Sequence, residues 1–417
     1  MARPAAPCGA RSDSRYTRSL SNQPTPPRAQ PLQRLRSLDG LRGVAAIVVV
    51  AYHSLLISPQ LADIVVNNKP PAPGSFWDLL LYSPLRIFIA GNEAVIVFFV
   101  LSGLVLTLQV RRERDFNWGT YFPRRLVRLY LPMFASVVFA VIVTLLLHRD
   151  RDASDSAWVQ FYTYPDFSWK FAIQAADVFN GTPDFNSPLW SLRWEVLFSL
   201  LLPVFVLIAS RGRKLAWTAI ALAPLAVLLG YENSVLPLVY LPAFIVGIAL
   251  AKLFSLRDEN AVGAAEAELG TPRVPWWGHL AWLAVAVASL FLLILHWLLQ
   301  PGIGQNTHVA FASSALIVLG AAGIVTVAAR WKPAIRVLSL PPIHWLGRIS
   351  FSLYLVHAPI LIATANVAHD LPWPVQTVIG VGISFGVAEL FTRLVDIPSH
   401  RLSKKIGRKA PIEAPAN

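Results

Sequence analysis

The hydrophobic positions of this chain fall into long runs separated by short polar connections. A helix that spans a bilayer needs roughly 20 mostly apolar residues. The stretches that meet this requirement are residues 39–58, 84–109, 126–147, 189–209, 215–231, 235–254, 277–299, 308–329, 345–365 and 374–396. The pattern predicts an all-α polytopic membrane protein with about ten transmembrane helices. The stretch at 215–231 fits least well, because it is short and contains Pro224.

The connections between these stretches alternate in charge. Lys and Arg occur in or beside every second connection, at 110–125, 210–214, 255–276 and 330–344, and again at the C-terminal end. The connections in between, at 59–83, 148–188, 232–234, 300–307 and 366–373, are poor in both residues. Lys and Arg collect in loops that stay in the cytoplasm. The alternation therefore predicts a multi-pass protein of the cell (plasma or inner) membrane with both termini in the cytoplasm.

The composition agrees with this class of protein. Of the 417 residues, 55% are hydrophobic and 14% are charged, whereas a soluble domain has about 25% charged residues. The formal net charge of +13 comes from clusters beside apolar runs, without helix-turn-helix or zinc-finger spacing, so no nucleic-acid partner is expected. The one cysteine, Cys8, excludes a disulfide within the chain and cysteine-ligated zinc, and we expect no metal.

Three regions differ in composition. Residues 1–36 are rich in Arg and Pro and have almost no aliphatic run, which is typical of a disordered basic cytoplasmic tail. Residues 37–402 contain all the apolar stretches and are predicted to form one membrane domain. Residues 403–417 are predicted to form a basic cytoplasmic tail, and no appended soluble catalytic module is expected.

Ionisable side chains within membrane helices are costly and mark candidate functional positions. Arg42 and His53 lie in the first apolar stretch about three helical turns apart. Both therefore project from one face, with roughly 16 Å between them along the helix axis. This spacing places Arg42 near the cytoplasmic surface and His53 deep in the bilayer. The alternative is a structural role, with Arg42 as a topological anchor and His53 as a hydrogen bonder between helices.

Two arginines stand at the start of the third apolar stretch. Arg125 and Arg128 are three residues apart and share a helix face. Paired guanidinium groups are suited to bidentate phosphate binding. The alternative is that these arginines signal topology and contact lipid headgroups.

The fourth and ninth apolar stretches also carry polar side chains. The fourth begins with Trp190 and Ser191 and holds Glu195 one turn later, and a buried carboxylate needs a partner or a raised pKa. In the ninth, Tyr354 and His357 follow helical spacing on one polar stripe. The first and ninth stretches run in the same direction, so residue counting places His357 and His53 at comparable depths.

Several short strings occur in a fixed order along residues 36–402. They are Leu38-Asp39-Gly40-Leu41-Arg42-Gly43 with a histidine at His53, Phe98-Phe99-Val100-Leu101-Ser102-Gly103, Arg125 with Arg128, Trp190-Ser191-Leu192 with Glu195, Ser352-Leu353-Tyr354-Leu355 with His357, and Asp396-Ile397-Pro398. In this set the chain resembles the integral-membrane acyltransferases of the acyltransferase-3 type, a family that includes bacterial surface-glycan O-acetylases.

The resemblance implies a reaction and its substrates. A cytoplasmic acyl-CoA, with acetyl as the family's usual group, would donate its acyl group to a hydroxyl of a surface glycan, a lipid-linked sugar or a related acceptor. His53 would be the general base, and Glu195 would fix the histidine tautomer or bind the acceptor. The remaining implied roles are CoA binding by Arg42, Arg125 and Arg128, oxyanion stabilisation by Tyr354 and His357, and substrate binding by Asp39, Trp190 and Ser191.

Two other functions are consistent with parts of this pattern. A proton-coupled secondary transporter or flippase would use His53, Glu195 and His357 as a proton relay. Such a protein would show paired halves and interrupted helices, and the chain has no clear internal repeat. A non-catalytic membrane scaffold would explain the apolar helices but not several deep ionisable groups.

Overall fold

The computed structural model describes residues 29–112, 116–147, 151–163, 168–177, 186–209, 212–265, 275–304 and 306–407. Within these ranges every assigned element is helical, and ten helices are long and apolar enough to cross a membrane. The predicted all-α polytopic architecture is therefore confirmed. Residues 1–28 and 408–417, which make up most of the two predicted tails, lie outside the described residues.

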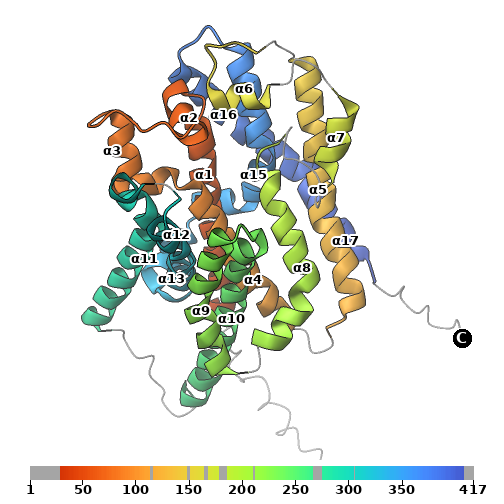
Figure 1. Cartoon of the computed structure of the whole chain (residues 1–417). Helices are drawn as coiled ribbons and strands as arrows, with labels where there is room; N and C mark the ends of the chain where they lie inside the picture. The colour runs from red at the N-terminus through yellow and green to blue at the C-terminus, as the bar shows by residue number, and fades with distance from the viewer. Residues whose placement is uncertain are drawn as a thin grey trace, which may run out of the picture.

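Figure 1 shows the helices as one bundle, with several of the short helices near its upper end. The long helices are α1 (Ala29–Leu55), α4 (Gly91–Arg112), α5 (Trp118–Leu146), α8 (Leu189–Ala209), α9 (Arg213–Glu232), α10 (Leu236–Ala265), α11 (Trp276–Ile303), α13 (Ile317–Arg330), α15 (Pro341–Val367) and α16 (Trp373–Phe391). The shorter elements are α2 (Pro59–Val66), α3 (Phe76–Tyr82), the 3-10 helix η1 (Pro84–Ile89), α6 (Ala157–Tyr162), α7 (Trp169–Ala176), α12 (His308–Ala315), α14 (Lys332–Leu338), the π-helical segment η2 (Thr392–Asp396) and α17 (Ile397–Lys405).

Some predicted boundaries were wrong. The apolar stretch at 84–109 is two elements, because Pro84–Ile89 forms η1 and the membrane helix α4 begins only at Gly91. The stretch predicted to begin at residue 126 is part of a helix that begins at Trp118, since basic residues near its start are accommodated inside the helix. The stretch at 215–231 forms one continuous helix despite Pro224.

Helix ends that are expected at the cytoplasmic face lie together. Gly40, near the start of α1, lies against the backbone of Leu338 at the end of α14. Arg124, near the start of α5, donates from Nε to the carbonyl of Ile406 at 2.9 Å, just after α17. These contacts join α1 to α14 and α5 to the residue that follows α17. Which side of the membrane this end faces stays a prediction.

Helices α1 and α15 form the centre of the bundle and pack against each other along their length. The contact is close because two glycines face each other. A Cβ added to Gly43 would lie 2.5 Å from the backbone nitrogen of Gly347, and a Cβ on Gly347 would overlap the carbonyl of Asp39. Only residues without a side chain allow the two backbones to approach this closely.

A second close contact joins α4 to α10. A Cβ on Gly103 would overlap the carbonyl of Phe244, and a Cβ on Gly247 would overlap the carbonyl of Val100. Gly103 and Gly247 therefore allow the two helices to pack closely. Because α4 also packs against α1, the α10–α4–α1–α15 order fixes one wall of the candidate site.

We expect Gly103→Leu to destabilise the protein by about 1–3 kcal/mol or more, because the added side chain has no space at the α4–α10 crossing. The measurement is thermal unfolding of the purified protein in detergent. Gly382→Leu is the matched control, since a Cβ at this exposed position on α16 meets no atom within 4 Å. Equal losses of stability in the two variants would contradict the close contact.

Candidate active site

The two histidines of α1 and α15 form a hydrogen-bonded pair. His53 Nδ1 lies 2.9 Å from His357 Nε2. This contact confirms that the two side chains reach the same depth in the bundle. His357 is fully buried, whereas His53 is only partly covered.

The backbone sets the tautomer of this pair. His357 Nδ1 lies 2.9 Å from the carbonyl oxygen of Leu353, one turn earlier on α15. A carbonyl can only accept, so His357 carries its proton on Nδ1 and its Nε2 is an acceptor. His53 must then donate from Nδ1 to His357. The lone pair of neutral His53 is consequently on Nε2, which gives this nitrogen the electronic form of a general base.

Trp158 covers the outer side of the pair. Its ring stacks on the His53 ring with 5.7 Å between centroids and an interplanar angle of 17°, and the tryptophan is 4% exposed. Aromatic residues in a connection between membrane helices often lie in a belt at the membrane surface. Trp158 does not, because its indole is buried against the histidine.

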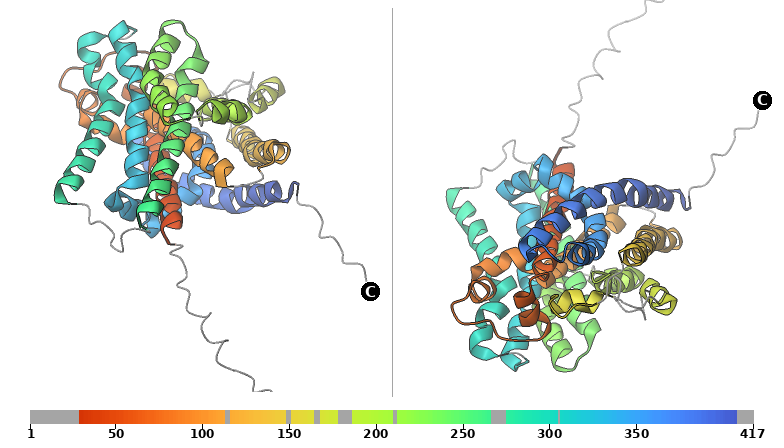
Figure 2. Two further views of the ribbon diagram at one scale, coloured as in Figure 1. Left: turned by 90° about the horizontal axis from the view of Figure 1, so that it is seen from below. Right: turned by 90° about the horizontal axis from the view of Figure 1, so that it is seen from above.

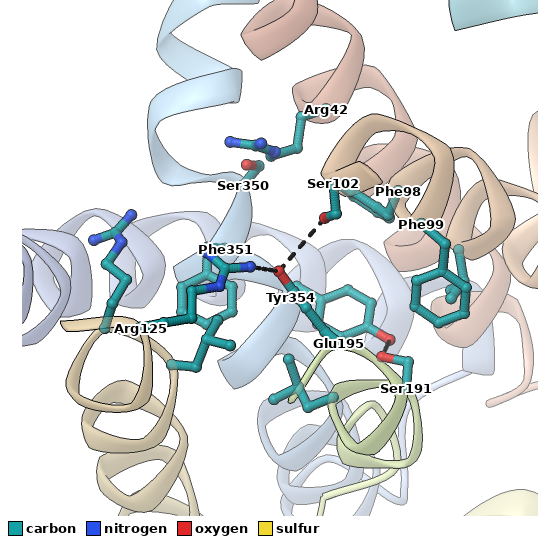
Figure 3. Close-up of a pocket in the computed structure, with 14 residues that line it drawn as sticks. Arg42, Phe98, Phe99, Ser102, Arg125, Ser191, Glu195, Ser350, Phe351 and Tyr354 are labelled. Atoms are coloured by element: carbon teal, nitrogen blue, oxygen red, sulfur yellow. Dashed lines mark hydrogen bonds and ion pairs between the residues drawn. The ribbon is translucent and has the colours of Figure 1, made fainter. Parts of the chain in front are cut away.

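A pocket of about 120 Å³ lies next to the histidine pair, between α1, α4, α5, α8 and α15 (Figure 3). Its lining includes Arg42, Val95, Phe98, Phe99, Ser102, Arg125, Arg128, Leu129, Ser191, Leu192, Glu195, Ser350, Phe351 and Tyr354. Residues from five helices and from positions more than 300 apart in the sequence thus converge on one small space with both charged and aromatic walls.

Ion pairs across the pocket satisfy its charged groups. Arg125 Nη2 lies 2.7 Å from Glu195 Oε1, and Arg125 Nε donates to Ser199 Oγ at 3.0 Å. Ser102 Oγ also donates to Glu195 Oε1, at 3.4 Å (Figure 3). Glu195 therefore binds an arginine of α5 and makes no contact with the histidine pair. Of the two roles expected for Glu195, fixing a histidine tautomer does not fit this geometry, because Leu353 performs it.

Arg128 and Arg42 have their own acidic partners. Arg128 Nη1 lies 2.8 Å from Asp396 Oδ1 in η2. Asp396 is followed by Pro398, whose missing N–H interrupts the regular helical bonding at the junction of η2 and α17. Arg42 Nη1 lies 3.5 Å from Asp39 Oδ1, one turn earlier on α1. Asp39 contacts the pocket only through Arg42.

Tyr354 stands between the pocket and the histidine pair. Its hydroxyl lies 2.7 Å from Ser191 Oγ (Figure 3) and donates to the carbonyl of Pro188 at 3.1 Å. The centre of its ring lies 6.1 Å from that of His357. Pro188 directly precedes α8, where its lack of an N–H leaves no bond unmade. In the described part of the chain, the histidines are thus neighbours of the pocket lining and not part of it.

Not all of the site residues predicted from the sequence lie at the pocket. The pocket gathers Arg42, Arg125, Arg128, Ser191, Glu195 and Tyr354, and the pair of His53 and His357 adjoins it. Trp190 is directed elsewhere, because its ring packs beside Tyr240 of α10 with 5.2 Å between centroids. In the described residues no group of three or more His, Cys, Asp and Glu side chains could hold a metal.

A buried arginine near Tyr52 of α1 was not predicted from the sequence. Arg86 of η1 has no exposed surface, and its guanidinium lies 3.8 Å from the ring centroid of Trp297 and 5.6 Å from that of Tyr52. Its three side-chain nitrogens make no hydrogen bond with the described residues. Burial lowers the pKa of Arg86, and the nearby carboxylate of Glu93 opposes this effect. Because Tyr52 precedes His53, this cluster supports the helix turn that carries the histidine.

The sequence comparisons identify the family. A family model described as an acyltransferase domain matches residues 35–393. The chain belongs to this acyltransferase family. The resemblance drawn from the short motifs is therefore confirmed, and the ten apolar helices make this acyltransferase a multi-pass membrane protein.

Curated relatives of this acyltransferase differ in length and source. It is 25% identical to the peptidoglycan O-acetyltransferase OatA of Listeria monocytogenes, over 87% of this chain and 55% of that protein. It is 28% identical to the acyltransferase MdmB of Streptomyces mycarofaciens, over 81% of this chain and 80% of the relative. The O-acetyltransferase PaAT-1 of Phomopsis amygdali is 26% identical, over 78% and 71% of the two chains. The chain thus spans about half the length of the listerial protein. No solved structure matches it significantly.

We expect Arg86→Met to destabilise this acyltransferase by about 3–5 kcal/mol, because Glu93 would be left buried without a cation nearby. Thermal unfolding in detergent measures the loss. The double variant Arg86→Met/Glu93→Gln removes both charges and should recover part of it. A single variant as stable as the parent would show that the stacked guanidinium contributes nothing.

Proposed function

We propose that this protein transfers a short acyl group, acetyl, from acyl-CoA to a hydroxyl of a glycan or a lipid-linked sugar, with His53 as the general base. The observation that carries the proposal is the chain of contacts from the Leu353 carbonyl through His357 to His53, which leaves His53 Nε2 as an acceptor. Family membership supports the reaction class. The names of the listerial and fungal relatives support O-acetylation.

The acyl donor is proposed to bind at the arginine side of the pocket. Arg42, Arg125 and Arg128 lie close enough to one another to meet phosphate groups together, and guanidinium groups bind phosphate in bidentate geometry. The choice of acetyl as the acyl group is supported by the names of the relatives that are O-acetyltransferases.

The proposed reaction passes through a tetrahedral intermediate. The acceptor hydroxyl attacks the thioester carbonyl while His53 Nε2 removes the hydroxyl proton, so a C–O bond forms and an oxyanion develops. The hydroxyl of Tyr354 can donate to this oxyanion once it leaves Pro188. Collapse of the intermediate breaks the C–S bond, and the thiolate takes the proton from the imidazolium of His53. Both nitrogens of His357 are occupied, so we propose a positioning role for it in place of oxyanion stabilisation.

The transporter hypothesis has less support. A proton relay through His53, Glu195 and His357 would need Glu195 to exchange protons with the pair, but its carboxylate is bound to Arg125. The family match supports acyl transfer instead.

We expect His53→Ala to lower kcat for acetyl transfer about 10²–10⁴-fold, the usual contribution of a general base. His357→Ala should lower kcat about 10–100-fold with little change in KM. The base would remain, but His53 would no longer be held in one tautomer and one orientation. Turnover of acetyl-CoA by purified protein, with folding checked by thermal unfolding, measures both. Near-parental turnover by His53→Ala would rule out its role as base.

We expect Arg128→Gln/Asp396→Asn to weaken acetyl-CoA binding about 10-fold or more, since a hydrogen bond to a charged group contributes about 1.5–3 kcal/mol. The double variant is used because Arg128 alone would leave Asp396 unpaired. Titration calorimetry gives the Kd. The control is Arg348→Gln, which removes an arginine whose partner Glu389 lies at the exposed face of α16. An equal effect in the control would refute a donor site at Arg128.

A further inference from the structure

A second and larger cavity lies away from the candidate active site. Its volume is about 570 Å³, and four helices, α9, α10, α11 and α13, form its walls. It shares no lining residue with the smaller pocket. Figure 2 shows α11 at the edge of the bundle, so this cavity belongs to the periphery of the membrane domain. A volume between about 300 and 1,000 Å³ is typical of sites for small organic molecules.

The walls of this cavity are apolar. They are built from Ile220 of α9, Leu250 and Leu253 of α10, Val285 of α11 and Leu319 of α13, with the indoles of Trp217 and Trp282 beside them. The one hydroxyl in the lining, that of Thr326, donates to the carbonyl of Ala322 on its own helix. A sugar would find few hydrogen-bond partners here, whereas a hydrocarbon chain would be well accommodated.

One end of the cavity carries two cations. Arg213 lies in the first turn of α9 and is exposed, and Arg330 is the last residue of α13. Arg330 is held in place, since its Nη2 donates to the carbonyl of Phe254 at 2.8 Å and its guanidinium lies 4.5 Å from the Phe254 ring centroid. No acidic residue is among the residues named for the lining. The cavity is therefore apolar within and positively charged at its mouth.

Exposed tryptophans locate this mouth at the membrane surface. Trp276 and Trp277, in the first turn of α11, are 75% and 63% exposed. Tryptophan is enriched where the hydrocarbon meets the headgroups. Arg213 and Arg330 also lie at helix ends, so their guanidinium groups are at headgroup level and the apolar part of the cavity is at the level of the acyl chains.

We propose that this cavity binds one anionic phospholipid, with an acyl chain between α9 and α11 and the phosphate at Arg213 and Arg330. Basic pockets between membrane helices recognise anionic headgroups in this way. The two cations favour an anionic lipid over a zwitterionic one, and the apolar walls favour a lipid over free phosphate. The lipid would pack between α9 and α11, which both also contact α12 and α13, and so would stabilise this edge of the bundle.

The test uses the full-length protein in mild detergent and two probes, phosphatidylglycerol and phosphatidylcholine with the same acyl chains. Native mass spectrometry gives the Kd of each. Phosphatidylglycerol is expected to bind more tightly, and Arg213→Gln should weaken its binding roughly fivefold, the effect of one arginine beside an anionic lipid. Lys214→Gln is the matched control, because Lys214 is an adjacent exposed cation outside the cavity lining.

A cavity-filling variant and a competition with inorganic phosphate distinguish the binding of a lipid from the binding of an anion alone. Thr326→Phe should fill part of the cavity and weaken the lipid without changing the charge at its mouth. Unchanged phosphatidylglycerol binding in this variant would overturn the insertion of an acyl chain. Equal binding of the two lipids, equal effects of Arg213→Gln and Lys214→Gln, or displacement of the lipid by millimolar inorganic phosphate would each overturn the proposal. None of these readouts depends on acyl transfer.

Discussion

The contact between the backbones of α1 and α15 is the constraint on which the candidate site depends. Gly43 and Gly347 bring the two helices together at a distance that no larger residue allows. About three turns further along α1, this approach places His53 within hydrogen-bond distance of His357. The same approach brings Arg42 of α1 and polar residues of α15 to one pocket. If the helices moved apart, the hydrogen bond and the pocket would be lost together.

The second constraint is electrostatic. The desolvation of an isolated guanidinium within a membrane domain is costly, and an acidic partner offsets part of this cost. Arg125 is paired with Glu195 and Arg128 with Asp396, so these bonds tie α5 to α8 and to η2. A phosphate that entered the pocket would compete with carboxylates that already hold the arginines. Under the proposed function, donor binding is thus an exchange of anionic partners, which would couple the donor to the positions of α5 and α8.

The sequence contained enough information to predict the membrane helices and the depth of the histidines, but not the contacts around them. Bilayer thickness sets a length that apolar runs reveal directly, and residue counting placed His53 and His357 at one level. Trp158 comes from a polar connection, so its packing on His53 depends on a fold that no local pattern encodes. The predicted membrane helix at 84–109 included Arg86, because a long apolar stretch with one charged residue still has the composition of a membrane helix. The partner of Glu195 could not be predicted either, because helix neighbours are decided by packing.

The position of Tyr354 connects these constraints to the proposed chemistry. Its ring lines the pocket, where a thioester would lie under the proposed function, and its centre is 6.1 Å from that of His357. A base in open contact with a bound thioester would activate water as readily as an acceptor hydroxyl. The Tyr354 hydroxyl is held by Ser191 and by the Pro188 carbonyl at the start of α8. Under the proposed function, a movement of α8 that accompanied the exchange of Glu195 for a phosphate would also shift the Tyr354 hydroxyl, and with it the part of the pocket wall that lies beside His357.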